Sequence, residues 1–344
     1  MVTGRSRTDQ AILSPSRRLA GLYVALLVML CASLLTGAVP LSLAQSLKGL
    51  WGGDDLAATI MREIRVPRTV LALFVGGILG VSGAALQGLM RNPLADPTVF
   101  GAPQAAAFGA VLVLYSGIAG ALSAALPVAA IAAALLSFVI LMRIVGRGAS
   151  VVALILAGLA IGTLAGAATS IVIALSANPF AVTEIVFWMM GSFEDRSMLN
   201  VSLSLPFIIA AMAMLLSQGN GYRALVLGED SATSLGIDVS RLRWMTLVAV
   251  AMGVGAAVAV SGAIGFVGLI APHGARLLVG ADPKRILWPS LLAGSLLMVM
   301  ADVLVRLVPA QTELRVGAVT ALLGVPLFVA AIRRHRGLFV EGAS

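Results

Sequence analysis

Apolar residues fill most of the chain in ten runs, and polar turns separate one run from the next. Each run has about the 20 residues that an α-helix needs to cross the hydrocarbon core of a bilayer. The pattern therefore predicts an all-α polytopic membrane protein with about ten transmembrane helices. The predicted spans are residues 19–39, 68–90, 98–116, 118–142, 151–175, 199–217, 244–263, 264–281, 286–305 and 316–332.

Three stretches disturb this simple pattern. Residues 45–67 are amphipathic and polar, and they separate the first span from the second. Glycine and proline interrupt the apolar runs within 81–116 and 260–285. Because these residues weaken or end helices, the span boundaries are least defined there.

Composition supports the membrane assignment. Of the 344 residues, 60% are hydrophobic and 11% are charged, and the mean hydropathy is +1.04. A soluble domain could not bury so much apolar surface. The net charge of +8 is no sign of nucleic-acid binding, since basic residues of a membrane protein first report its topology. The single cysteine, Cys31, permits no intrachain disulfide.

The distribution of basic residues predicts the orientation. With ten spans and a cytoplasmic N-terminus, 16 of the 23 lysines and arginines fall inside and 7 outside, as the positive-inside rule favours. We expect a single transmembrane domain over 19–335 between cytoplasmic tails at 1–18 and 336–344. Its halves, 19–217 and 244–335, are joined by a cytoplasmic loop at 219–243. The outer basic residues are Lys48, Arg62, Arg65, Arg68, Arg196, Arg306 and Arg315.

A weak internal repeat appears at an offset of 179 residues. VSGA at 81–84 recurs at 260–263, and VFGA at 99–102 resembles LVGA at 278–281. The offset carries the second span onto the seventh, so the two halves would have opposite orientations. Inverted repeats of this kind are common in transporters.

The loop at 219–243 is a polar island between apolar spans. Gly228 precedes Glu229 and Asp230, and Gly236 follows Leu235, which predicts a short helix with acids in its first turn and glycine at its C-terminal end. Most polar loops are only solvated connections. A docking helix for a soluble partner is the other interpretation.

Four further features carry candidate chemistry. RNPLADP at 91–97 is a proline-broken stretch that forms either a tight turn or irregular backbone lining a cavity. Pro272 interrupts the eighth span beside His273 and Arg276, which share a helix face. Their expected role is structural or gating, because one histidine alone is a poor metal site.

The other two features lie at the predicted outer face. Asp302 and Arg306 are four residues apart, which predicts an ion pair, and Arg306 could also reach the surface. The connection at 183–192 is amphipathic, and Trp188 suits an interfacial position in a surface anchor or a lid.

Energy-coupling chemistry is missing from the sequence. Neither lysine, Lys48 or Lys284, lies in a phosphate-binding G-x-x-x-x-G-K-[ST] loop. The sequence contains no nucleophile–base pair and no metal-ligand cluster, and few charged residues lie deep in the spans. A pump of this kind must therefore take its energy from a partner, and this favours the docking interpretation of the island.

Several ordered motifs resemble one family over residues 20–335. It is the permease subunit of bacterial binding-protein-dependent ABC importers for iron–siderophore complexes, heme and vitamin B12, a type II, FecCD-like family. The motifs are RVPR (65–68), VSGAALQGLMRNPLADP (81–97), LAGLAIG (156–162), FWMMGS (187–192), LGEDSATSLGID (227–238), GAIGFVGLIAPHGARLL (262–278) and LRVGAVTALLGVP (314–326).

The resemblance implies a role for each motif. The family's cytoplasmic loop rests on the ATPase subunit, and its gates lie in the NPL stretch and before the LAG motif. Outer arginines of the family pair with acidic residues of the substrate-binding protein. The implied ATPase-coupling residues are Leu227, Gly228, Glu229, Asp230, Ala232, Leu235 and Gly236; the docking residues are Arg65, Arg68 and Arg306; the gate residues are Asn92, Leu94, Ser150 and Val151.

The resemblance also implies the assembly. Two permease copies, preferably identical, would bind two ATPase subunits that hold ATP and Mg²⁺, and a periplasmic binding protein would deliver the cargo. The chain itself would bind no cofactor, no metal and no nucleic acid, and would lie in the bacterial inner membrane.

The cargo is expected to be a ferric siderophore first, heme second and vitamin B12 third. The mostly apolar segment Ser150-Val151-Val152, which is hydroxyl-rich in the vitamin B12 permease, counts against the last. The rival interpretations are an ion-coupled secondary transporter and a scaffold or receptor without transport.

Overall fold

Helices are the only regular secondary structure in the part of the chain that the computed structural model describes, residues 15–52, 56–118, 122, 124–146, 150–308 and 314–334. Seven of them are long and apolar enough to cross a membrane. These are α1 (Pro15–Leu35), α4 (Val66–Met90), α7 (Ala125–Val145), α8 (Val151–Ala174), α10 (Met198–Ser217), α13 (Val239–Ser261) and α15 (Pro283–Leu307).

The remaining helices are shorter or lie at the ends of the bundle. Apolar helices are α5 (Ala102–Ser116), α9 (Pro179–Met189), α14 (Val267–Val279) and α16 (Val316–Arg334). The others are α2 (Leu43–Trp51), α3 (Leu56–Thr59), the π-helix η1 (Ile60–Arg65), the 3₁₀-helix η2 (Pro97–Phe100), α11 (Gly219–Leu225) and α12 (Glu229–Ser234).

Each of the ten predicted spans corresponds to one helix, so the all-α polytopic fold is confirmed. The main differences are in length. The second span is longer than predicted, because α3 and η1 run into α4 and give one continuous helical stretch over Leu56–Met90. The third and eighth spans are shorter, because only α5 and α14 within them are regular helix.

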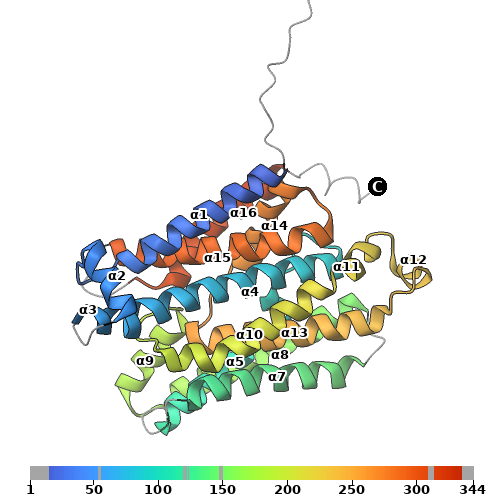
Figure 1. The fold of residues 1–344 in the computed structure, drawn as a ribbon. Coiled ribbons are helices and arrows are strands. Elements are labelled where there is room, and N and C mark those ends of the chain that lie inside the picture. Colours follow the sequence, from blue (N-terminus) through green and yellow to red (C-terminus); the bar gives the residue numbers. More distant parts are fainter. Residues whose placement is uncertain are drawn as a thin grey trace, which may run out of the picture.

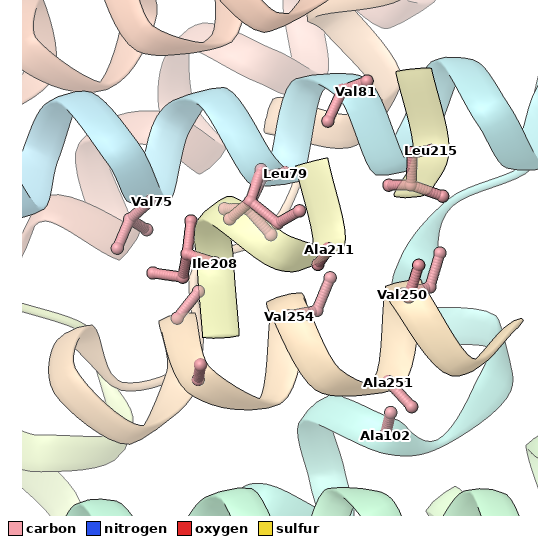
Figure 2. Close-up of a cluster of buried hydrophobic side chains, with 14 of the residues drawn as sticks. Val75, Leu79, Val81, Ala102, Ile208, Ala211, Leu215, Val250, Ala251 and Val254 are labelled. Atoms are coloured by element: carbon pink, nitrogen blue, oxygen red, sulfur yellow. The ribbon is translucent and has the colours of Figure 1, made fainter. Parts of the chain in front are cut away.

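Two helices, α4 and α13, form the centre of the bundle and run in opposite directions (Figure 1). Most of their side chains are buried, unlike those of the peripheral helices. Helix α10 fills the space beside them, and Figure 2 shows Leu79 of α4, Ala211 of α10 and Val254 of α13 pointing toward one another. The apolar core therefore lies between these three helices.

Each central helix is packed mainly by helices from the other half of the sequence. Helices α14 and α15 lie against α4, whereas α5 and α7 lie against α13. Both central helices are followed by an irregular segment and then by a short helix, at 91–101 before α5 and at 262–266 before α14. The same order of elements, a central helix, an irregular segment and a short helix, thus occurs in both halves of the sequence.

The sequence repeat at an offset of 179 does not follow this spatial relation. Gly83 lies in the middle of α4, whereas its counterpart Gly262 lies beyond the end of α13 with φ +71. Gly101 precedes α5, but its counterpart Gly280 follows α14. The matches paired small residues with different structural roles, so this alignment is wrong.

Helices α4 and α15 approach one another closely through small residues. A Cβ on Gly80 would lie 2.2 Å from the carbonyl oxygen of Ser290, and one on Gly294 would lie 2.2 Å from that of Gly76. There is thus no room for a side chain at either glycine, and such close approach of two backbones is the packing that small residues permit in membranes. It explains the abundance of glycine in the second span.

The expected break at Pro272 lies elsewhere. Helix α14 continues through Pro272, and the irregular backbone comes before it, where Phe266 has φ +68. A proline cannot donate to the carbonyl four residues earlier, here that of Gly268. The Nε2 of Gln87 lies 3.5 Å from this oxygen, and the helix continues because another group serves the freed carbonyl.

Trp188 also departs from its expected position at the membrane interface. Its side chain is only 7% exposed, and its Nε1 is buried. Phe180, at the other end of α9, is 85% exposed instead. Helix α9 thus presents its first turn outward, whereas Ile185 and Trp188 of its second half are buried, and the helix packs on α5.

Candidate functional site

Two helices are too short to cross a membrane and therefore place irregular backbone within it. Helices α5 and α14 have 15 and 13 residues, so they measure about 22 and 20 Å. The hydrocarbon core is about 30 Å thick. Irregular backbone at that depth is tolerated only where it is packed in protein or lines a cavity.

A cavity of about 280 Å³ lies where these two irregular segments meet. Thr98 and Gln104 line it from one side, Ala263 and Gly265 from the other, and Gly166 from α8. Both halves of the sequence thus contribute to one cavity, which is open to the surface where Thr98 and Ala263 are exposed. The remaining lining residues are Pro103, Ala107, Thr169, Met189 and Ile264.

The predicted gate residues Asn92 and Leu94 lie on an exposed turn at the end of α4. The Oδ1 of Asn92 accepts a hydrogen bond of 2.9 Å from the backbone N–H of Leu94. Arg91 ends α4 in the left-handed conformation with φ 51, and Asp96 caps η2 by accepting from the N–H of Thr98 at 2.9 Å. The turn is therefore built by local side-chain hydrogen bonds.

The second predicted gate begins α8. The Oγ of Ser150 accepts a hydrogen bond of 3.2 Å from the backbone N–H of Ala153 and caps the helix. Val151 is the first residue of α8, and its side chain lies outside the described part of the chain. Among the described hydrogen bonds, none joins Ser150 to the turn at 91–97. Both gate assignments stay predictions.

Gln87 is a site residue that sequence reasoning missed. Its Nε2 lies 3.4 Å from the carbonyl oxygen of Ala95, and its Oε1 accepts a hydrogen bond from Arg276. Gln87 is 3% exposed, so this amide connects the turn after α4 to α14 inside the protein. The available signal was one long polar side chain in the otherwise small and apolar second span.

The predicted docking helix is present as α12. Gly228 and Gly236 flank it with φ +100 and +84, and Glu229 and Asp230 occupy its first turn, as expected from the sequence. Positive φ favours glycine, which explains the residue type at both positions. Ala232 is completely buried and fixes α12 to the bundle.

Helix α12 presents a mixed surface at one end of the bundle (Figure 1). Leu227 and Leu235 are 66% and 64% exposed on either side of it, and Asp230 is exposed between them. Glu229 forms an ion pair with Arg243 of α13. The surface is therefore apolar at its margins and is linked electrostatically to a central helix.

Helix α11 is joined to α15 at the same end. Arg223 Nη2 lies 2.5 Å from Asp282 Oδ2, and Asp282 Oδ1 accepts from the N–H of Lys284 at 2.9 Å, so Asp282 caps α15. The hydrogen bond from Arg223 holds the pKa of Asp282 below its ordinary value. Its stabilising effect is thus complete above the ordinary pKa of about 4 and is lost as the pH falls through the depressed value.

We expect Asp282→Ala to lower the free energy of unfolding by about 0.5–2 kcal/mol, because α15 loses its cap. Asp282→Asn keeps an oxygen for capping and loses only the exposed ion pair with Arg223, so its loss should be the smaller of the two. Thermal unfolding in detergent at neutral pH and at pH 3 compares the two. Equal losses for both variants would show that charge, and not capping, is what matters.

The three arginines expected to dock a binding protein lie inside the protein. Only 2% of the surface of Arg65 and 6% of that of Arg68 is exposed, and the side chain of Arg306 is 4% exposed. Arg65 donates to the carbonyl oxygens of Leu34, Leu35 and Val39, at 2.9, 3.0 and 2.6 Å, respectively. These contacts connect the residue before α4 to the end of α1.

Asp302 is shared by the other two arginines. Its Oδ1 accepts from Arg68 Nε at 2.9 Å. Its Oδ2 lies 2.8 Å from Arg306 Nη2 but accepts no well-aligned hydrogen bond, so this contact is mainly electrostatic. Arg306 also donates to the carbonyl oxygens of Ser33 and Thr36, both at 2.8 Å.

The predicted pair of Asp302 and Arg306 is therefore confirmed, whereas the suggestion that Arg306 reaches the surface is wrong. The guanidinium group turns inward because buried acceptors on α1 and α15 surround it. The docking role of Arg65, Arg68 and Arg306 stays a prediction, and their contacts favour a structural role.

Metal chemistry has no support in the described residues, where no group of three histidine, cysteine or carboxylate side chains could hold an ion. The bundle has two helices too short to span a membrane, a cavity between the irregular segments that precede them, and a separate surface at one end. This arrangement defines a multi-pass membrane transport protein, and comparison with known proteins specifies it further.

The family model of the FecCD transport family matches residues 25–334, and the chain belongs to this family. Curated relatives support the match. The chain is 41% identical over 300 residues to the uncharacterized ABC transporter permease protein YvrB of Bacillus subtilis, which covers 85% of this chain and 84% of YvrB. It is 38% identical to the ferric enterobactin transport system permease protein FepD of Escherichia coli, covering 91% and 94%.

Two further similarities are informative. The cobalamin import system permease protein BtuC of Halobacterium salinarum is 37% identical over 82% of this chain and 76% of its own. A solved structure described as an inward-facing conformation of a putative metal-chelate type ABC transporter has a TM-score of 0.82 at 31% identity and covers 93% of this chain and 99% of its own. The chain is thus an ABC transporter permease.

Proposed function

We propose that the chain forms half of the translocation pathway of an ATP-driven, binding-protein-dependent importer for an iron chelate. The cavity between the irregular segments at 91–101 and 262–266 carries this proposal. In transporters, broken helices of this kind form the substrate site near the bilayer midplane. Membership of the FecCD transport family supports the same assignment.

A second copy of the chain completes the pathway in this proposal. A single cavity of about 280 Å³ falls below the roughly 300–1,000 Å³ typical of sites for small ligands, and a chelate is bulky. Helix α8 borders the cavity and exposes Leu156, Leu159 and Leu164. A homodimer with α8 near its two-fold axis would cover this face and join two cavities.

The energy comes from two copies of a separate ATPase subunit, which hold ATP and Mg²⁺, while this chain binds no cofactor. The surface formed by α11, α12 and residues 226–228 is the proposed contact. Leu227 and Leu235 supply apolar area, and the acids of α12 supply charge. Arg243 would transmit motion of Glu229 directly to α13.

The proposed location is the bacterial inner membrane, with the α11–α12 end and both chain termini in the cytoplasm. Helix α1 begins, and α4 and α7 end, at the α11–α12 end, so Arg91 and Arg143 lie on that side as the positive-inside rule requires. A periplasmic binding protein would dock at the opposite end, around α2 and α3.

The proposed cargo is a ferric siderophore, with heme and vitamin B12 as the next candidates. The similarity to FepD supports the first, and the similarity to BtuC supports the last. An ion-coupled mechanism has less support, because none of the residues lining the cavity is acidic, basic or histidine.

Reconstitution in liposomes tests the proposal. The chain is combined with its ATPase and binding protein, and ATP-dependent uptake of a ferric siderophore, heme and vitamin B12 is measured side by side. Uptake of one cargo that stops when any protein component is left out is the expected result. Uptake of none of the three would refute the assigned cargo class.

A further inference from the structure

Gln104 carries an amide oxygen, Oε1, that has no hydrogen-bond partner in the described structure. Its Oε1 is buried, and the side chain lies against α8, where a Cβ on Gly162 would lie 3.6 Å from that oxygen. An unsatisfied buried polar group costs about 1–3 kcal/mol. Such groups are rare in native proteins and call for an explanation, such as strain or a functional role.

The position of Gln104 in the fold suggests a functional explanation for this unpaired oxygen. The residue belongs to the first turn of α5 and lines the cavity of about 280 Å³ at membrane depth. The hydroxyl of Thr98 donates to Asp96 Oδ1 at 2.7 Å, and that of Thr169 donates to the carbonyl oxygen of Ala165 at 2.9 Å. Both hydroxyl hydrogens therefore already take part in hydrogen bonds within the protein.

Among the residues that line this cavity, Gln104 thus contributes the one side-chain amide, whose Oε1 accepts no hydrogen bond in the described structure, and the two threonine oxygens add acceptors. The lining has no charged side chain. Such a surface suits a ligand that presents neutral donors and acceptors, and it offers nothing to balance a carboxylate or a cation. A neutral amide binds weakly enough for a transported ligand to leave again.

We propose that Gln104 is a specificity-determining residue that hydrogen-bonds the neutral, amide- or carbonyl-bearing face of a chelate as it passes through the cavity. This inference rests on the proposed transport function and adds the chemical class of the cargo surface. It places an uncharged ferric hydroxamate or cobalamin, both rich in such groups, ahead of heme with its two carboxylates.

The test uses the full transporter in liposomes with a neutral ferric hydroxamate, heme and cobalamin as probes. Gln104→Met keeps the side-chain length and removes both hydrogen-bonding groups. We expect it to lower the maximal uptake rate of the transported probe by about three- to tenfold, as the loss of one hydrogen bond implies. Ser202→Ala removes a hydrogen-bonding side chain that is exposed on α10, outside both the cavity lining and the α11–α12 surface, and should leave this rate unchanged.

A second measurement separates contact with the cargo from a structural role. Cys31 is first replaced by serine, and Gln104→Cys is then added, so that one thiol remains. The transported probe should slow alkylation of this thiol during turnover, whereas a thiol from Ser202→Cys in the same background should react at an unchanged rate. Protection would place the probe against position 104.

The outcomes separate the two proposals. Wild-type uptake with an unchanged rate for Gln104→Met and no protection of the thiol would overturn the role of Gln104 and leave the importer intact. Preferential transport of heme with unaffected Gln104→Met would overturn the cargo class as well. Absence of uptake of all three probes by the wild type would overturn both proposals.

Discussion

Replacing Asp302 by asparagine is expected to lower the free energy of unfolding by about 3–5 kcal/mol, the usual cost of removing one partner of a buried ion pair. The carboxylate is completely buried and contacts both Arg68 and Arg306. Asparagine has nearly the same shape but leaves two guanidinium charges without their shared anion. The loss would appear in thermal unfolding in detergent and in the amount of protein in the membrane.

Glu194→Gln is the matched control for this change. Glu194 pairs with Arg315 at 2.7 Å, but its side chain is 35% exposed. A pair that water can reach contributes about 1 kcal/mol or less. If Asp302→Asn unfolded no more easily than Glu194→Gln and instead weakened binding-protein affinity, the arginines would have the docking role and not the structural one.

Reversing Glu229 and Asp230 to lysine is expected to reduce coupled ATPase activity at least about tenfold while membrane insertion stays normal. Misplaced charge at an interface costs several kcal/mol, and about 1.4 kcal/mol already corresponds to a factor of ten. Both residues lie in the first turn of α12, and Glu229 would also lose its ion pair with Arg243. Ligand-stimulated ATP hydrolysis by the assembled complex is the measurement.

Glu184→Lys provides the comparison for this reversal. Glu184 is exposed on α9, at the other end of the bundle, so the change in charge is the same in kind and the coupling surface is untouched. Normal ATPase activity in the α12 variant, or an equal loss in the α9 variant, would remove α12 from the coupling mechanism.

Local patterns predicted the helices well. Ten apolar runs gave ten helices, because about 20 apolar residues have few other ways to satisfy their backbone in a membrane. The glycines and acids around α12 also specified its bounds, since positive φ and first-turn acids are local requirements. The ion pair of Asp302 and Arg306 followed from their spacing on one helix.

Local sequence patterns could not predict contacts between residues that are far apart in the chain. Arg68 and Asp302 are 234 residues apart in sequence, and nothing local shows that they meet. The effect of Pro272 was overestimated because Gln87, on another helix, lies beside the carbonyl that the proline leaves free. The cavity and the unpaired amide of Gln104 depend on how α5, α8 and residues 262–266 come together, which only the fold defines.

The energy source of transport tests the central claim most directly. Liposomes that contain the chain, its ATPase and its binding protein are loaded either with ATP or with a non-hydrolysable analogue, and proton and sodium gradients are imposed or collapsed in each case. The account predicts uptake that requires hydrolysable ATP and the ATPase and persists without either gradient. Uptake driven by an ion gradient in the absence of the ATPase would contradict it.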